Sequence, residues 1–160
     1  MFQLPTTTIF NPEYSEKLGD CYVKSDFDKA LKYYQRSLAL SNDPGKIYFK
    51  IASGYDLKNN SDSALFYFRK YNLHNIKNEN AYNRMAILFL DQEGGEDSAL
   101  IYAQKAISLK PNDPNGYYTL SMVYIDLSRF EDAIHTARAG AKIKSNYPLF
   151  NMAIGLGYFH

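Results

Sequence analysis

Four alanines divide the chain into units of nearly constant length, and this period limits the fold more than any other feature of the sequence. They stand in steps of 34, 35 and 34, at Ala30, Ala64, Ala99 and Ala133. Aromatic residues keep almost the same period, in steps of 33, 34, 35 and 34, at Tyr22, Tyr55, Phe89, Tyr124 and Tyr158. Such a period is typical of stacked repeats, each of which buries its apolar face against its neighbours.

The spacing within each unit predicts helices. An aromatic or small residue follows each alanine by four positions, which is the spacing of one helix face, at Tyr34, Phe68, Ala103 and Ala137. Asn11-Pro12, Asp43-Pro44 and Asp113-Pro114 each place a capping side chain before a proline, which predicts a helix start. We expect no strand and nine helices, at residues 12–24, 27–41, 44–57, 61–73, 79–91, 96–110, 114–127, 130–144 and 148–159.

The sequence of each unit resembles the tetratricopeptide repeat (TPR). The pattern of that repeat is an aromatic residue, Leu-Gly, Tyr, Ala, a second aromatic residue and a closing Pro. Leu18-Gly19 precedes Tyr22 here, and "EDSALIYAQKAISLKP" is the second helix nearest to that pattern. The resemblance implies an all-α fold, a right-handed α–α superhelix (α-solenoid) of TPR helical hairpins. It divides the chain into an N-terminal arm at 1–11, repeats at 12–43, 44–78, 79–113 and 114–147, and a capping or truncated fifth-repeat helix at 148–160.

Charge and hydropathy exclude several classes of partner. Lysine and arginine number 18 against 17 acids, and a net charge of +1 does not favour nucleic-acid binding. No run approaches 18 apolar residues, so we expect no membrane insertion. The start "MFQLPTTTIF" lacks the basic and apolar regions of a signal peptide, which favours a cytoplasmic location. The alternative that a signal sequence was removed before residue 1 stays open.

The side chains that usually carry catalysis or bind metals are scattered. His74, His135 and His160 lie on different repeats, without further ligands at metal-binding spacing. Cys21 directly precedes Tyr22, at the position where Gly54 and Gly157 precede the tyrosines of other repeats. We therefore expect a small buried residue rather than a reactive thiol. We therefore expect no metal, no cofactor and no enzymatic activity.

The turn "DQEGGED" has one residue more than the corresponding turns. It follows a helix and has acidic flanks, so it does not indicate a phosphate-binding loop. We expect the extra residue to be absorbed in the loop, so that deleting Gly94 or Gly95 is nearly neutral.

The resemblance implies that the first helix of each repeat lines a concave groove that receives a partner. Its outward positions hold Phe49, Lys50, Ser53, Asn80, Asn83, Arg84, Ile87, Asn115, Tyr118 and Met122. The apolar members are the most informative, because a solvated face would favour charge. Glu16 and Asp20 indicate a solvated face, and they disfavour the basic clamp with which some relatives hold the C-terminal carboxylate of a chaperone.

These features predict a non-catalytic protein-interaction module that binds a peptide or partner helix by apolar anchors and amide hydrogen bonds. The alternative is a regulatory or sensory TPR segment of a longer enzyme or signalling protein. The apolar helix at 148–159 adds two further alternatives, self-association with a second copy or continuation into a longer chain.

Overall fold

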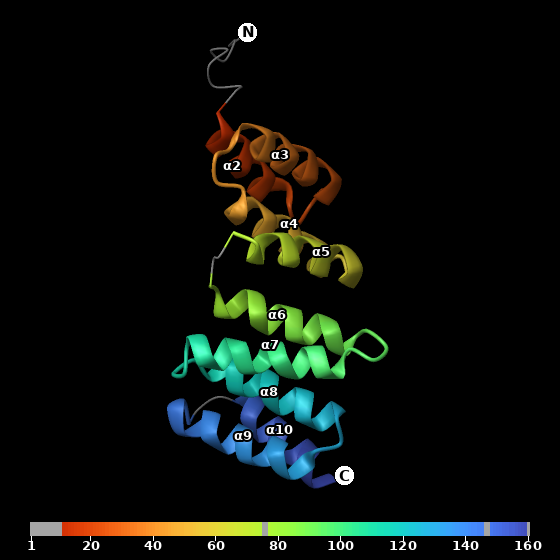
Figure 1. Cartoon of the computed structure of the whole chain (residues 1–160), viewed down its shortest axis with the longest axis vertical. Helices are drawn as coiled ribbons and strands as arrows, with labels where there is room; N and C mark the ends of the chain where they lie inside the picture. Colours follow the sequence, from red (N-terminus) through yellow and green to blue (C-terminus); the bar gives the residue numbers. More distant parts are fainter. Residues whose placement is uncertain (1–10, 75–76, 146–147, 160) are drawn as a thin grey trace. The chain divides into compact units, whose positions relative to one another are not determined.

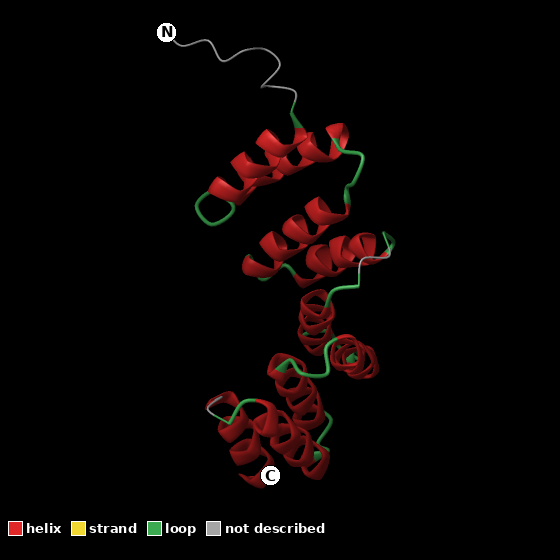
Figure 2. Cartoon of the chain, turned by 90° about the vertical axis from the view of Figure 1, so that its left-hand side faces the viewer, coloured by secondary structure: helices red, strands yellow, loops and turns green. Residues whose placement is uncertain are grey.

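The computed structural model describes residues 11–74, 77–145 and 148–159, and these residues form helices and loops without a strand (Figures 1 and 2). The expected all-α class is therefore confirmed. Residues 1–10 of the expected N-terminal arm lie outside the described ranges. The helices are α2 (Pro12–Tyr22), α3 (Phe27–Leu40), α4 (Gly45–Leu57), α5 (Ser61–Asn72), α6 (Glu79–Leu90), α7 (Glu96–Leu109), α8 (Pro114–Asp126), α9 (Phe130–Ile143) and α10 (Pro148–Phe159).

The helices form two compact units, Met1–Ile76 and Lys77–His160. The first unit contains two helical hairpins, α2 with α3 and α4 with α5. The second contains the hairpins α6 with α7 and α8 with α9, and α10 packs against both α8 and α9. None of the described helices has the length and apolar character needed to cross a membrane.

Polar side chains cap the helix starts much as the Asn-Pro and Asp-Pro pairs predict. Asn11 accepts hydrogen bonds from the backbone N–H groups of Glu13 and Tyr14, and Asp113 accepts one from Asn115. At Asp43-Pro44 the helix begins one residue later than predicted, at Gly45, whose N–H donates to the Asp43 carboxylate at 3.3 Å. The caps satisfy backbone donors that have no partner within their helix.

The first unit has a core rich in aromatic rings. Phe27, Tyr34 and Ile51 are buried in one cluster with Ala30 and Ile47. The Phe27 ring meets the Tyr55 ring edge to face, with 4.9 Å between centroids. Phe27 also lies over Gly54, where a Cβ atom would come within 2.1 Å of its ring. Because Phe27 belongs to the first hairpin and Gly54 to the second, this contact joins the two hairpins.

Small residues allow close helix approach in the second unit. Ala99 and Ala133, two of the four periodic alanines, are fully buried, as Ala30 and Ala64 are in the first unit. Phe150 of α10 is buried against Ala137 and Ala153 and lies over Gly140, where a Cβ atom would come within 2.3 Å of its ring. The first turns of α10 thus close the apolar flank of the α8–α9 hairpin.

Two sequence expectations are corrected by the backbone and by burial. Gly94 has φ +72°, a conformation that favours glycine, and a Cβ on Gly95 would lie 1.9 Å from the Phe89 carbonyl oxygen. The glycines therefore hold a defined turn, and this geometry argues against the expectation that deleting Gly94 or Gly95 is nearly neutral. Cys21 is exposed rather than buried.

Candidate functional site

A hollow of about 310 Å³ lies between α6 and α8 in the second unit. It is lined by Asn80, Asn83, Arg84, Ile87, Asn115, Tyr118 and Thr119. Six of these seven residues are among those predicted for the groove. Thr119 was missed, although it corresponds in the repeat to Lys50 and Arg84, so the same reasoning extended by one residue would have found it.

Helical spacing brings the lining residues together. Asn83 and Arg84 follow Asn80 by three and four positions, and Ile87 follows them by four and three, so the four residues share one face of α6. The caps Asn78 and Asp113 fix where α6 and α8 begin, because each accepts hydrogen bonds from the backbone of the first turn. The hollow is therefore built from two regular helices and needs no loop to form it.

Asn83 has an unusual environment within this hollow. Its side chain is buried, at 7% exposure, and neither its amide nitrogen nor its carbonyl oxygen has a hydrogen-bond partner. Leaving a buried polar group unpaired costs about 1–3 kcal/mol. Phe49, Asn83 and Tyr118 hold corresponding places in three successive repeats, so Asn83 stands where both neighbouring repeats have an aromatic ring.

The other lining side chains form the wall and the rim. Asn80, Arg84 and Asn115 are exposed, and Ile87 is 40% exposed. Tyr118 is half-buried and packs against the cluster of Ala137, Phe150 and Ala153. Tyr118 therefore contributes to the core as well as to the hollow. Met122 is half-buried and does not line the hollow.

Two of the predicted groove residues of the first unit, Phe49 and Ser53, have partners within the α4–α5 hairpin. The Phe49 ring contacts those of Phe68 and Tyr71, at centroid distances of 5.8 and 5.4 Å. The Ser53 hydroxyl donates to the Phe49 carbonyl oxygen at 2.9 Å. Phe49 therefore supports the α4–α5 hairpin and is not only an outward residue of a groove.

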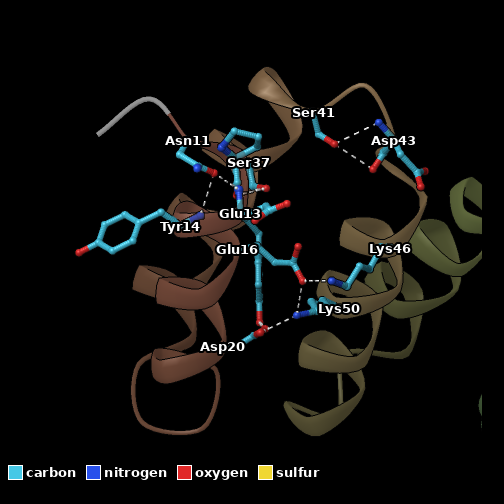
Figure 3. Close-up of polar contacts among 12 residues, drawn as sticks. Asn11, Glu13, Tyr14, Glu16, Asp20, Ser37, Ser41, Asp43, Lys46 and Lys50 are labelled. Carbon is cyan, nitrogen blue, oxygen red and sulfur yellow. Dashed lines mark hydrogen bonds and ion pairs between the residues drawn. The ribbon is translucent and has the colours of Figure 1, made fainter. Parts of the chain in front are cut away.

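Lys50 is held by acids from the preceding repeat, as Figure 3 shows. Its ammonium lies 2.6 Å from Glu16 and 2.5 Å from Asp20, and Lys46 lies 2.7 Å from Glu16. The Glu16 side chain is only 12% exposed, so the expectation of a solvated acidic face is wrong for this residue. An incoming carboxylate would have to compete with both acids for Lys50.

Two pKa shifts reflect this network. Burial by itself would raise the pKa of Glu16, but hydrogen bonds from Lys46 and Lys50 outweigh it and hold the pKa below its ordinary value. Burial, followed by the hydrogen bond that the Tyr34 hydroxyl donates to Asp20 at 2.9 Å, raises the pKa of Tyr34 well above its ordinary value. The charged form of Glu16 and the neutral form of Tyr34 are thus the ones that the fold stabilises.

The candidate residues do not form a metal centre. Within the described part of the chain, no three His, Cys, Asp or Glu residues are grouped so that they could hold a metal ion. The lining of the α6–α8 hollow consists of amide groups, one guanidinium group and apolar side chains. Groups of these kinds bind ligands through hydrogen bonds and apolar contact.

Comparison with known proteins places the fold. The family model of the tetratricopeptide repeat matches residues 114–147, which contain α8 and α9. Residues 114–147 therefore form a tetratricopeptide repeat. The fold class predicted from the sequence, an α-solenoid of TPR helical hairpins, is confirmed by solved structures that share it. No curated protein sequence matches the chain.

Three of these TPR structures illustrate the likeness. A crystal structure of MamA has 22% identity and a TM-score of 0.82, over 92% of this chain and 81% of that one. MamA residues 41-end from Desulfovibrio magneticus RS-1 have 13% identity and a TM-score of 0.82, over 92% and 84%. YrrB, described as a TPR protein with an unusual peptide-binding site, has 16% identity and a TM-score of 0.79, over 96% and 79%. At these identities the likeness shows the fold.

Proposed function

We propose that the chain is a non-catalytic protein-interaction module that binds a peptide segment of a partner protein in the hollow between α6 and α8. The observation that carries this proposal is the buried Asn83 side chain, whose donor and acceptor both lack a partner inside the protein. A ligand that made these hydrogen bonds would remove the cost of the unpaired Asn83 atoms, and this would stabilise the complex.

A peptide fits the composition of this hollow. Its backbone and side chains can meet the exposed amides at the rim, and an apolar side chain can cover Ile87. YrrB, which shares the fold, is described as having a peptide-binding site, and this supports a peptide as the ligand class. Phe49, Lys50 and Ser53 serve mainly to hold the first unit together in this proposal.

The test is a pair of substitutions at exposed isoleucines. Random peptides displayed on phage are selected on the intact chain, and the affinities of the recovered peptides are measured. Ile87→Asp should weaken binding about tenfold or more, because it places a charge on the wall of the hollow. Ile101 is 50% exposed on α7 and does not line the hollow, so Ile101→Asp is the matched control and should bind normally. Equal effects of the two substitutions would overturn the proposal.

Self-association through α10 is a second proposal. Met152 and Tyr158 are exposed on this helix, and a Cβ on Gly155 would have no atom within 4 Å. These residues leave an apolar surface that a second copy could cover. Light scattering over a concentration series should show a rising mass for the intact chain, and Met152→Glu should abolish the rise. A mass that stays monomeric up to high concentration would refute this proposal.

A further inference from the structure

The α6–α8 hollow carries an inference that rests on the proposed function and specifies the ligand. We infer that it selects a glutamine or asparagine side chain of the partner peptide, whose carboxamide pairs with the carboxamide of Asn83. The hollow, the burial of Asn83 and its two unpaired atoms are the observations that lead to this ligand.

A carboxamide is the side-chain group that satisfies both unpaired atoms at once. The Asn83 amide nitrogen donates, and its carbonyl oxygen accepts. A second carboxamide placed opposite makes two hydrogen bonds, one in each direction. A carboxylate would accept from the nitrogen but repel the carbonyl oxygen, and an ammonium would do the reverse. An aliphatic side chain would leave both atoms unpaired in a site from which it had excluded water.

The pairing does not depend on which way the Asn83 amide is turned. Flipping the group over exchanges the positions of its oxygen and nitrogen. Since both atoms lack a partner inside the protein, the exchanged amide still presents one donor and one acceptor to the hollow. The ligand carboxamide can turn in the same way, so the match is kept in either orientation.

The depth of Asn83 favours a side chain over a peptide backbone as its partner. The residue is 7% exposed, whereas Asn80 and Asn115 in the same hollow are exposed. A backbone lying across the hollow meets the exposed amides first, and a side chain can extend from it to the recessed one. The volume of about 310 Å³ leaves room for such a side chain.

The repeat pattern supports a role in binding for this asparagine. At the corresponding places of the neighbouring repeats, Phe49 and Tyr118 pack their rings against residues of the core. Asn83 instead is buried with both of its side-chain polar atoms lacking a hydrogen-bond partner inside the protein. Residues that break the local pattern at a cost in stability tend to occur at functional sites.

The experiment compares peptide selections on three forms of the intact chain. A random dodecamer library on phage is selected on the wild type, on Asn83→Leu and on Asn112→Leu, which makes the same change at an exposed asparagine outside the hollow. Wild type and Asn112→Leu should both enrich Gln or Asn at one fixed position. Asn83→Leu should lose that enrichment while it still selects apolar residues elsewhere in the peptide.

A synthetic peptide from the wild-type pool then measures the selectivity. Replacing its conserved Gln by Met or by Glu should weaken binding roughly ten- to one-hundredfold. The side-chain NH₂ signal of Asn83, assigned by its absence from the Asn83→Leu spectrum, should shift in a ¹H–¹⁵N spectrum when the Gln peptide binds.

The outcomes separate this inference from the proposed function. Peptides that bind and are weakened by Ile87→Asp, but show no preference for a carboxamide, would overturn the inference and leave the proposed function standing. Unchanged affinity for the Met peptide, or an Asn83 signal that does not shift, would overturn it as well. A failure to enrich any peptide would overturn the proposed function and this inference with it.

Discussion

Gly19 of α2 lies directly beneath the ring of Tyr34 in α3, so closely that a Cβ on Gly19 would come within 2.4 Å of the ring. Tyr34 is buried, and its hydroxyl donates to Asp20, which leaves the ring little freedom to move aside. Gly19→Ala should therefore lower the free energy of unfolding by about 1–3 kcal/mol, the usual cost of overpacking a core. Denaturant titration of both proteins measures the difference.

Gly155 provides the matched control for this substitution. It occupies the place in α10 that Gly19 holds in α2, because the repeat period brings the two glycines into the same register. A Cβ there would have no atom within 4 Å. Gly155→Ala should raise stability by about 0.5–1 kcal/mol, because alanine favours a helix interior over glycine. Equal losses at both glycines would show that the contact with Tyr34 is not what makes Gly19 necessary.

Periodicity predicts the parts of this fold that depend on residues close in sequence. The four periodic alanines are fully buried, and Asn11 and Asp113 cap helices where their prolines indicate. The prediction failed for Cys21 because it was read from glycines at the corresponding positions of other repeats, and hairpins with different neighbours bury the same position differently.

Side-chain partners across repeats were harder to predict. The sequence predicts Lys50 for the groove and Glu16 and Asp20 for a solvated face, but the pairing of these residues depends on how the two hairpins are aligned. The burial of Asn83 could not be predicted from the sequence, because the repeat pattern assigns its position to the outward face of the helix. Exposure there is set by the packing of whole helices, which composition does not reveal.

The ion pairs of Glu16 predict a dependence of stability on pH. The folded protein lowers the pKa of Glu16 from its ordinary value of 4.5, so its contribution is complete above that value and is lost as pH falls below it. Glu16→Gln should cost about 1 kcal/mol at pH 7, and the difference from wild type should shrink in acid. Denaturant titrations from pH 7 down to pH 3 measure both.

Glu93→Gln is the control for this pH dependence. Glu93 is exposed in the turn between α6 and α7, so its substitution should leave the pH dependence of stability unchanged. A Glu16→Gln protein whose deficit persists undiminished at pH 3 would show that the lost interaction was not with the ionised carboxylate.

Ser128 holds a backbone conformation that serine adopts at a cost. Its φ is 57°, in the turn between α8 and α9, and Asn59 has φ 54° in the turn between α4 and α5. Glycine reaches this region without the clash of a Cβ atom, and asparagine tolerates it better than most residues. Ser128→Gly should raise the melting temperature, with a gain of up to about 1 kcal/mol in the free energy of unfolding.

The matched change at Asn59 tests the reason for that gain. Asn59→Gly should gain less, because asparagine already tolerates the left-handed region. Thermal unfolding of the two variants and of the wild type measures the gain from each substitution. A larger gain at Asn59 than at Ser128 would contradict the assignment of strain to the serine.

Asn83 affects both the stability of the free protein and peptide binding. One substitution at this residue should raise the stability and weaken the binding. Asn83→Leu replaces a buried amide that has no partner by an apolar side chain of similar size. The free protein should gain about 1–2 kcal/mol, since the cost of burying unpaired polar atoms is removed. Binding of the carboxamide peptide should fall in the same variant.

Asn83→Asp provides the opposite change. It should destabilise the free chain, because a carboxylate buried without a partner is costlier than an amide. Denaturant titration and peptide affinity, measured on the same preparations, test both variants. A leucine variant less stable than wild type would mean that Asn83 contributes to the fold itself, and its unpaired amide would then no longer indicate a ligand.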